Sequence, residues 1–119
     1  MSGILAFNAS VVGKDPGKSL AVALWRGKTI VGGLTGWTWM GWCYVELLWI
    51  EERYRGKGYG AQLMRKAEAE VRKRGVRNMF LDTYSFQAPG FYKKLGFRQY
   101  GKLRDFPKGH NRYLLKKAL

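Results

Sequence analysis

The residue types best suited to chemistry gather in one short basic segment, which reads Arg55-Gly56-Lys57-Gly58-Tyr59-Gly60. Its glycines allow the backbone to turn sharply and let a ligand approach the amides without Cβ atoms in the way. Two full positive charges, from Arg55 and Lys57, lie in the same place. Such a segment suits a phosphate group, most simply a pyrophosphate. A solvated loop or a loop that touches nucleic acid can have the same composition, so these alternatives stay open at this point.

The segments on either side of this loop indicate how it is positioned. Residues 43–50 form an apolar and aromatic run, which is the composition of a buried strand. Residues 61–74 favour a helix, with apolar side chains at helical spacing at Leu63, Met64, Ala67 and Val71. The predicted order is therefore strand, loop, helix. The loop leads directly into the first turn of the helix, where the free amides and the helix dipole favour an anion.

Two common nucleotide-binding motifs do not account for this loop. A P-loop would end in Gly-Lys-Ser or Gly-Lys-Thr, and the loop does not. The dinucleotide fingerprint needs a third glycine, but Gly60 is followed by Ala-Gln-Leu. A separate Gly17-Lys18-Ser19 segment mimics the end of a P-loop, but a strand is expected after it where a P-loop requires a helix.

A second motif lies downstream of the loop at a fitting distance. Residues 55–60 match the pattern Arg/Gln-x-x-Gly-x-Gly/Ala, and residues 81–97 end in Phe91-Tyr92-x-x-x-Gly96-Phe97. With both motifs in this order, the sequence resembles the GNAT superfamily of acetyl-CoA-dependent N-acetyltransferases, in particular its small variants with a Phe-Gln-Ala segment. The resemblance covers roughly residues 19–119, which is most of the chain.

The resemblance implies an α/β fold with a mixed, mostly antiparallel sheet flanked by helices and a splay beside the central strand. Residues 1–119 are expected to form a single acetyl-CoA-binding domain. Further elements expected from the residues are strands at 20–25, 30–34, 78–84, 98–102 and 112–116, and a short helix at 89–95. Residues 1–13 suit the end of a helix or a short strand. The helical part that relatives carry here is expected to be short or missing, which leaves the acceptor side undefined.

The resemblance also assigns residues to the cofactor. Backbone groups near residues 48–50 are expected to bind the pantetheine arm of acetyl-CoA and to polarise the acetyl carbonyl, and the amides of residues 55–60 are expected to hold the pyrophosphate. The expected cofactor contacts are Leu48, Trp49, Ile50, Arg55, Gly56, Lys57, Gly58, Tyr59, Gly60, Ala61 and Phe91. No metal ion is expected. The implied reaction is transfer of acetyl to a primary amine by direct attack, with the acceptor left open.

Three further side chains are candidates for proton transfer. Tyr92 lies where the family often has a general acid for the departing sulfur, and the alternative is packing beside Phe91. Glu46 lies nine residues before Arg55, a spacing at which some relatives have a base that acts through water. An exposed strand position or a structural salt bridge is an equal alternative for Glu46. His110 lies in a polar loop that suggests exposure, with a role as base as the alternative.

The composition narrows the remaining choices. No run of 18 apolar residues occurs, so no membrane span is expected, and the lone Cys43 suits core packing and a cytoplasmic setting. The net charge of +14 attracts either anionic acetyl-CoA or nucleic acid. A basic nucleic-acid-binding module, and a GNAT-like protein that binds CoA without turnover, therefore stay as alternatives.

Tryptophan is unusually frequent in this chain. Residues 37–42 read Trp-Thr-Trp-Met-Gly-Trp, which suits packing in the core and a hairpin, or else an acceptor wall or subunit contact. Because five tryptophans in a chain of 119 residues suggest uncovered apolar surface, a homodimer is expected.

Overall fold

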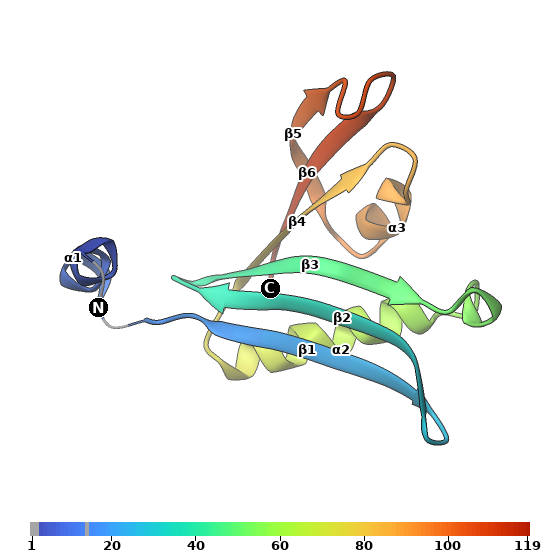
Figure 1. The fold of residues 1–119 in the computed structure, drawn as a ribbon, viewed down its shortest axis with the longest axis horizontal. Coiled ribbons are helices and arrows are strands. Elements are labelled where there is room, and N and C mark those ends of the chain that lie inside the picture. Colours follow the sequence, from blue (N-terminus) through green and yellow to red (C-terminus); the bar gives the residue numbers. More distant parts are fainter. Residues whose placement is uncertain (1–2, 14) are drawn as a thin grey trace.

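The chain folds into a six-stranded sheet accompanied by helices, as shown by a computed structural model that describes residues 3–13 and 15–119 (Figure 1). The strand order is β1-β2-β3-β4-β6-β5, and every neighbouring pair is antiparallel except β3 and β4. This arrangement confirms the expected mixed α/β class. The elements are α1 (Gly3–Val12), β1 (Lys18–Arg26), β2 (Thr29–Trp39), β3 (Trp42–Ile50), the 3₁₀ turn η1 (Glu52–Tyr54), α2 (Tyr59–Lys73), β4 (Asn78–Tyr84), α3 (Pro89–Lys94), β5 (Arg98–Arg104) and β6 (Asn111–Ala118).

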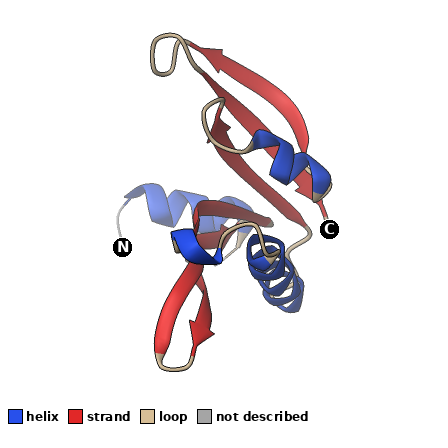
Figure 2. Cartoon of the chain, turned by 90° about the vertical axis from the view of Figure 1, so that its right-hand side faces the viewer, coloured by secondary structure: helices blue, strands red, loops and turns tan. Residues whose placement is uncertain are grey.

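The sheet opens between β3 and β4, which is the expected splay. These two strands pair in parallel only from Trp42 with Asn78 to Tyr44 with Phe80. Beyond Tyr44 they diverge, so the rest of β3 has no partner in β4 (Figure 1). Figure 2 shows the two parts of the sheet running in different directions. The second half of β3 therefore has one edge of backbone groups available to a ligand.

A bulge in β3 lies directly beside the splay. Thr35 of β2 pairs with Leu47, but the next residue, Gly36, pairs with Val45. Glu46 is thus the extra residue that has no partner in β2. A bulge bends the strand and increases its twist, and this distortion is consistent with the divergence of β3 from β4.

Helix α2 covers one face of the sheet because its apolar side chains repeat at helical spacing. Leu63, Met64, Ala67 and Val71 have almost no exposed surface, as the spacing predicts. They pack against strand residues of two adjoining buried clusters, and Cys43 is a fully buried member of the larger one. The expectation that Cys43 is a core residue is confirmed.

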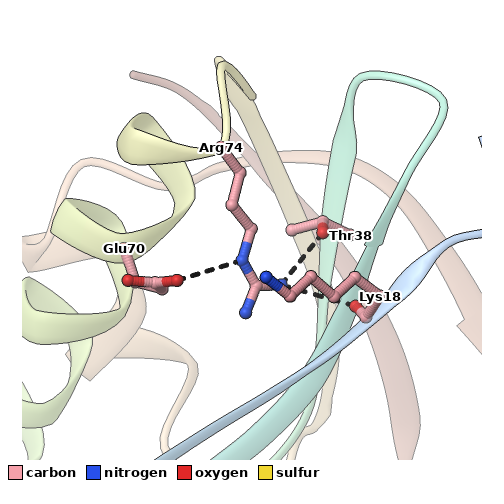
Figure 3. A network of polar contacts seen from close by, with 4 residues as sticks. All are labelled: Lys18, Thr38, Glu70 and Arg74. Carbon is pink, nitrogen blue, oxygen red and sulfur yellow. Dashed lines mark hydrogen bonds and ion pairs between the residues drawn. The ribbon is translucent and has the colours of Figure 1, made fainter.

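The C-terminal end of α2 is fastened to the β1–β2 hairpin through Arg74 (Figure 3). Its Nε donates to Glu70 Oε1 at 3.2 Å, and the i,i+4 spacing of the two residues in the sequence predicts this ion pair. Its Nη1 donates to Thr38 Oγ1 at 3.0 Å and to the Lys18 carbonyl at 3.4 Å. Because the Arg74 side chain is only 14% exposed, these bonds fix the helix against the hairpin with little competition from water.

The same i,i+4 spacing predicts a second pair, Glu68 with Arg72, but this prediction is wrong. Glu68 is only 8% exposed and accepts a hydrogen bond from Lys117 Nζ at 2.6 Å. The helix turns Glu68 toward β6, so its partner comes from the other end of the sequence. A buried carboxylate needs such a partner, whereas Arg72 reaches solvent.

Several element boundaries differ from those expected. Helix α2 begins at Tyr59 and not at residue 61, because Gly58 takes the N-cap position in the left-handed conformation (φ 84°). Strand β2 runs to Trp39 and does not end at residue 34. Its glycines stay within the strand where neighbours crowd them: a Cβ at Gly32 would lie 2.8 Å from the Ile50 side chain.

The N-terminal region is helical where the sequence left a choice of helix or strand. Helix α1 precedes β1, and the tryptophan segment is divided between β2, a turn at Met40 and Gly41, and β3. The glycines and the proline of residues 13–19 predict a loop in this segment, but Lys18 and Ser19 belong to β1. Residues 1, 2 and 14 of these segments lie outside the described residues. Within the described part of the chain, no helix is both long and apolar enough to span a membrane.

Candidate active site

A cleft of about 710 Å³ lies at the splay, where β3 leaves β4. Its walls come from the end of β3, the loop before α2, the middle of β4 and the segment that enters α3. Its lining residues are Val45, Glu46, Leu47, Leu48, Trp49, Ile50, Tyr54, Arg55, Gly56, Gly58, Tyr59, Gly60, Leu81, Asp82, Thr83, Gln87, Ala88, Phe91 and Tyr92. The fold therefore brings the two sequence motifs to one cavity.

One end of the cleft has the features of an anion site. Gly58 caps α2 without any side-chain cap bond, so no capping side chain occupies the amides of the first helical turn. A Cβ at Gly56 or Gly58 would meet no atom within 4 Å, which leaves open space beside the backbone. Arg55 Nε donates to the Ile50 carbonyl at 2.8 Å and thus holds its guanidinium beside the end of β3. Free amides, a helix dipole and a fixed cation together suit a phosphate.

Gly60 and Phe91 form the contact between the two motifs. A Cβ at Gly60 would lie 3.1 Å from Phe91 Cζ, so the absence of a side chain at this position lets the ring pack on the helix. This contact sets the distance between the first turn of α2 and α3. Nine of the eleven expected cofactor residues thus line one cleft.

Two of the expected cofactor residues are not in the cleft wall. Lys57 is exposed, and its Nζ lies 5.9 Å from the centre of the Tyr54 ring. Ala61 follows Gly60 in α2 and is partly buried. Both neighbour wall residues in sequence but do not line the cavity itself.

Tyr92 lines the cleft from α3. Its ring packs edge-on against Phe91, with ring centres 5.1 Å apart, and against Phe97 at 6.0 Å. Burial raises the pKa of the Tyr92 phenol above its ordinary value, so the hydroxyl keeps its proton at neutral pH. Among the residues that the structure describes, none forms a hydrogen bond with this hydroxyl. The group is therefore a proton donor that is available to a ligand.

Glu46 and His110 have different surroundings. Glu46, the bulge residue of β3, is exposed and lines the cleft, and no described residue forms an ion pair with it. His110 is exposed and does not line the cleft. Its Nδ1 lies 3.3 Å from Ser85 Oγ, and its ring packs edge-on against Phe86. Of these two candidates, Glu46 is therefore the one placed where a base for the cleft could act.

Sequence reasoning missed the polar residues that β4 contributes. Asp82 is 13% exposed; its Oδ1 accepts a hydrogen bond from the Tyr44 hydroxyl at 2.6 Å, and its Oδ2 forms an ion pair with Arg112. Gln87 Oε1 accepts from Thr83 Oγ1 at 3.1 Å and from the Tyr84 amide, which fixes the turn that enters α3. The sequence did contain a signal for Asp82: it is a lone aspartate inside a predicted strand that is largely apolar. A carboxylate in such a place needs polar partners.

Comparisons with known sequences agree with the geometry. A family model described as the acetyltransferase (GNAT) family matches residues 5–97. A blasticidin-S acetyltransferase from Streptomyces morookaense is 40% identical over 91 residues, which is 76% of this chain and 67% of the relative. An acetyltransferase from Agrobacterium fabrum is 33% identical over 109 residues, which is 91% of this chain and 80% of the relative.

A solved structure gives the same result. The crystal structure of an acetyltransferase from Bacillus cereus superposes with a TM-score of 0.90 at 36% identity, over 98% of this chain and 86% of that one. Sequence and structure thus agree over nearly the whole chain. The chain belongs to the acetyltransferase (GNAT) family, whose enzymes take the acetyl group that they transfer from acetyl-CoA.

Proposed function

We propose that this chain acetylates a primary amine by direct attack of the amine on acetyl-CoA. The observation that carries the proposal is that the free edge of β3, the glycine loop and Tyr92 meet in the same cleft. A screen of primary amines that measures free CoA release tests it. Turnover with any amine supports the proposal. Binding of acetyl-CoA without release of CoA for all amines favours a binding protein without catalysis.

The cleft residues fit the parts of acetyl-CoA. The amides before and within the first turn of α2, with Arg55, would hold the pyrophosphate. The backbone of residues 48–50 would hold the pantetheine arm, because this part of β3 has no strand beside it on the side of β4. A β3 amide there would donate a hydrogen bond to the oxygen that becomes negative in the tetrahedral intermediate.

Direct attack is supported by the chemistry of the one cysteine. An acyl-enzyme would need a nucleophile such as a thiolate. Cys43 is fully buried in the core, and burial raises its pKa to about 11. At neutral pH it is an inert thiol that does not line the cleft. The amine itself is therefore the nucleophile.

Two side chains carry out the proposed proton transfers: Glu46 accepts a proton and Tyr92 donates one. The ammonium form of the acceptor gives one proton to Glu46 through water, and the neutral nitrogen then attacks the acetyl carbon. The new N–C bond forms, the C–S bond breaks, and the departing thiolate takes the proton of the Tyr92 hydroxyl. The attacking nitrogen loses a second proton as the amide forms, and this proton restores the Tyr92 hydroxyl through solvent. Glu46 releases the first proton to solvent, so one proton is released per turnover of a protonated amine.

The acceptor proposed here is a small molecule with an amino group. The Streptomyces morookaense relative bears the name of a small-molecule substrate, blasticidin-S. The net charge of +14 also disfavours polycationic acceptors such as lysine-rich proteins or polyamines, because like charges repel over the whole surface.

We predict that Gly58→Val removes binding of acetyl-CoA. The new side chain would fill the open space beside the loop amides and block close approach of the pyrophosphate. A ligand at 100 times its Kd stabilises the folded state by about 2.7 kcal/mol, so acetyl-CoA should raise the Tm of the unaltered chain and not that of the variant. Differential scanning fluorimetry measures both.

The matched control for this variant is Gly75→Val. Gly75 follows α2 with φ 76°, and it too has no atom within 4 Å of a new Cβ, so the backbone strain is alike. We expect the Gly75 variant to lose stability but to keep its thermal shift with acetyl-CoA. An unaltered shift in Gly58→Val would contradict the proposed site.

We predict that Glu46→Gln lowers turnover at neutral pH and recovers as the pH rises. If Glu46 is the base, the variant depends on amine that has already lost its proton, and this fraction grows with pH. A pH–rate profile of kcat/KM for one accepted amine measures the effect. Glu52→Gln, a change at an exposed residue outside the cleft wall, is the control and should leave the profile unchanged. A Glu46 variant with a normal profile would assign the base to water.

We also propose a homodimer, because α1 has exposed apolar side chains. Ile4, Phe7 and Val11 are 65%, 63% and 66% exposed, which is unusual for one short helix. Light scattering should give twice the mass of the chain at high micromolar concentration, and Phe7→Asp should shift it toward the monomer. A monomer at all concentrations would exclude this assembly.

A further inference from the structure

A second cavity, of about 280 Å³, adjoins the active-site cleft. Its lining residues are Trp37, Tyr44, Phe80, Leu81, Asp82, Tyr100, Arg112 and Leu114. Leu81 and Asp82 line the larger cleft as well, so the two cavities meet at β4, directly beside the splay. A molecule in the second cavity would therefore lie next to the place where the acetyl group is transferred.

One wall of this cavity is aromatic. Ladder pairing sets Trp37 opposite Tyr44 and Tyr44 beside Phe80, so the three rings share one face of the sheet. Ring centres are 5.4 Å apart for Trp37 and Tyr44 and 4.9 Å apart for Tyr44 and Phe80. All three side chains are only partly buried. Such a wall favours a flat unsaturated ring, which stacks or packs edge-on against aromatic side chains.

The size of the cavity limits what it can hold. An apolar cavity of about 150 Å³ is enough for benzene. The 280 Å³ here would take one ring system with a short chain. The volume therefore points to a small acceptor.

The polar end of the cavity is Asp82. A carboxylate has about four acceptor positions, and Tyr44 and Arg112 occupy one on each oxygen. Two positions remain for the hydrogens of an ammonium group. Arg112 lines the same cavity, and its buried Nε has no hydrogen-bond partner among the described residues.

We propose that this second cavity binds the acceptor, and that the acceptor is a primary amine joined by a short chain to a flat unsaturated ring. The proposal rests on the acetyl transfer proposed above. The ring lies against Trp37, Tyr44 and Phe80, and Asp82 receives the amino group where the two cavities meet. Asp82 is then a substrate-binding residue, and the proton transfers stay with Glu46 and Tyr92.

Two amines with equal numbers of carbon atoms test the proposal: 2-phenylethylamine and its saturated analogue 2-cyclohexylethylamine. Calorimetry measures their affinities for the chain saturated with coenzyme A, so the result does not depend on turnover. We expect the phenyl compound to bind about tenfold more tightly, the size of one good aromatic contact. Trp37→Leu should bring the ratio close to one. Trp25→Leu, at an exposed tryptophan outside both cavities, should leave it unchanged.

Each outcome has one meaning. Equal affinities, or tighter binding of the cyclohexyl compound, would overturn this inference even if both amines are acetylated. Tight binding of the phenyl compound without CoA release from any amine would instead overturn the proposed function. If Trp37→Leu does not fold, Asp82→Asn keeps the shape of that side chain and removes its negative charge. That variant should keep the ratio and weaken both amines, and unchanged affinities would exclude Asp82 as the ammonium site.

Discussion

Tyr92→Phe should lower kcat by about 10²–10⁴-fold, the usual value of general acid catalysis. The change removes only the hydroxyl group, and the ring stays to pack against Phe91 and Phe97. The core and the affinity for acetyl-CoA should therefore change little, which is the pattern of an interaction made in the transition state. Steady-state kinetics with an accepted amine measure kcat, and calorimetry measures the affinity.

The pH dependence adds a second check on Tyr92. Because burial raises the pKa of its phenol, the acid form persists through neutral pH and is lost only above the ordinary tyrosine range. The unaltered enzyme should lose kcat on that alkaline side, and Tyr92→Phe should lack this limb. Tyr113→Phe is the control, since Tyr113 packs against the same core but does not line the cleft. Near-normal turnover of Tyr92→Phe where chemistry is rate-limiting would make Tyr92 a packing residue.

Local sequence signals were enough to predict the parts of the fold nearest the cleft. Apolar spacing in α2, the run of residues 43–50 and the residues of β4 all lie in continuous segments, so periodicity alone reveals them. The start of α2 was predicted two residues late, because Tyr59 and Gly60 belong to a loop motif and to the first turn at once. The helix propensities of glycine and tyrosine do not reveal that Gly58 is the N-cap and that the helix begins at Tyr59.

The polar part of the site could not be predicted in the same way. Tyr44 and Asp82 are 38 residues apart in sequence, and Arg112 comes from yet another strand. Their contact depends on the parallel pairing of β3 with β4 and the antiparallel pairing of β4 with β6. No local pattern in the sequence specifies that register. The glycine loop and Tyr92, by contrast, could be predicted as candidate site residues because each lies within a short motif.

Gly36→Ala should destabilise the fold by about 3 kcal/mol, the upper part of the range for overpacking. A Cβ at Gly36 would collide with the backbone carbonyl oxygen of Tyr44 and lie 3.3 Å from the Val45 Cα. The obstacle is backbone in the paired strand, so no side chain can rotate away to relieve it. Gly36 is also the residue at which the pairing of β2 with β3 shifts register. The methyl group must therefore push β3 away or move the bulge.

This clash ties the stability of the sheet to the geometry of the active site. A displaced bulge would move Glu46 and the end of β3. The Gly36→Ala protein that still folds should therefore also lose acetyltransferase activity. For a chain of this size we expect the Tm to fall by about 12 °C, measured by circular dichroism. Gly90→Ala is the matched control, because α3 has no atom within 4 Å of a new Cβ there and alanine favours a helix. A Gly36 variant with unaltered Tm and activity would contradict this prediction, because β3 would then accommodate the methyl group without moving the bulge.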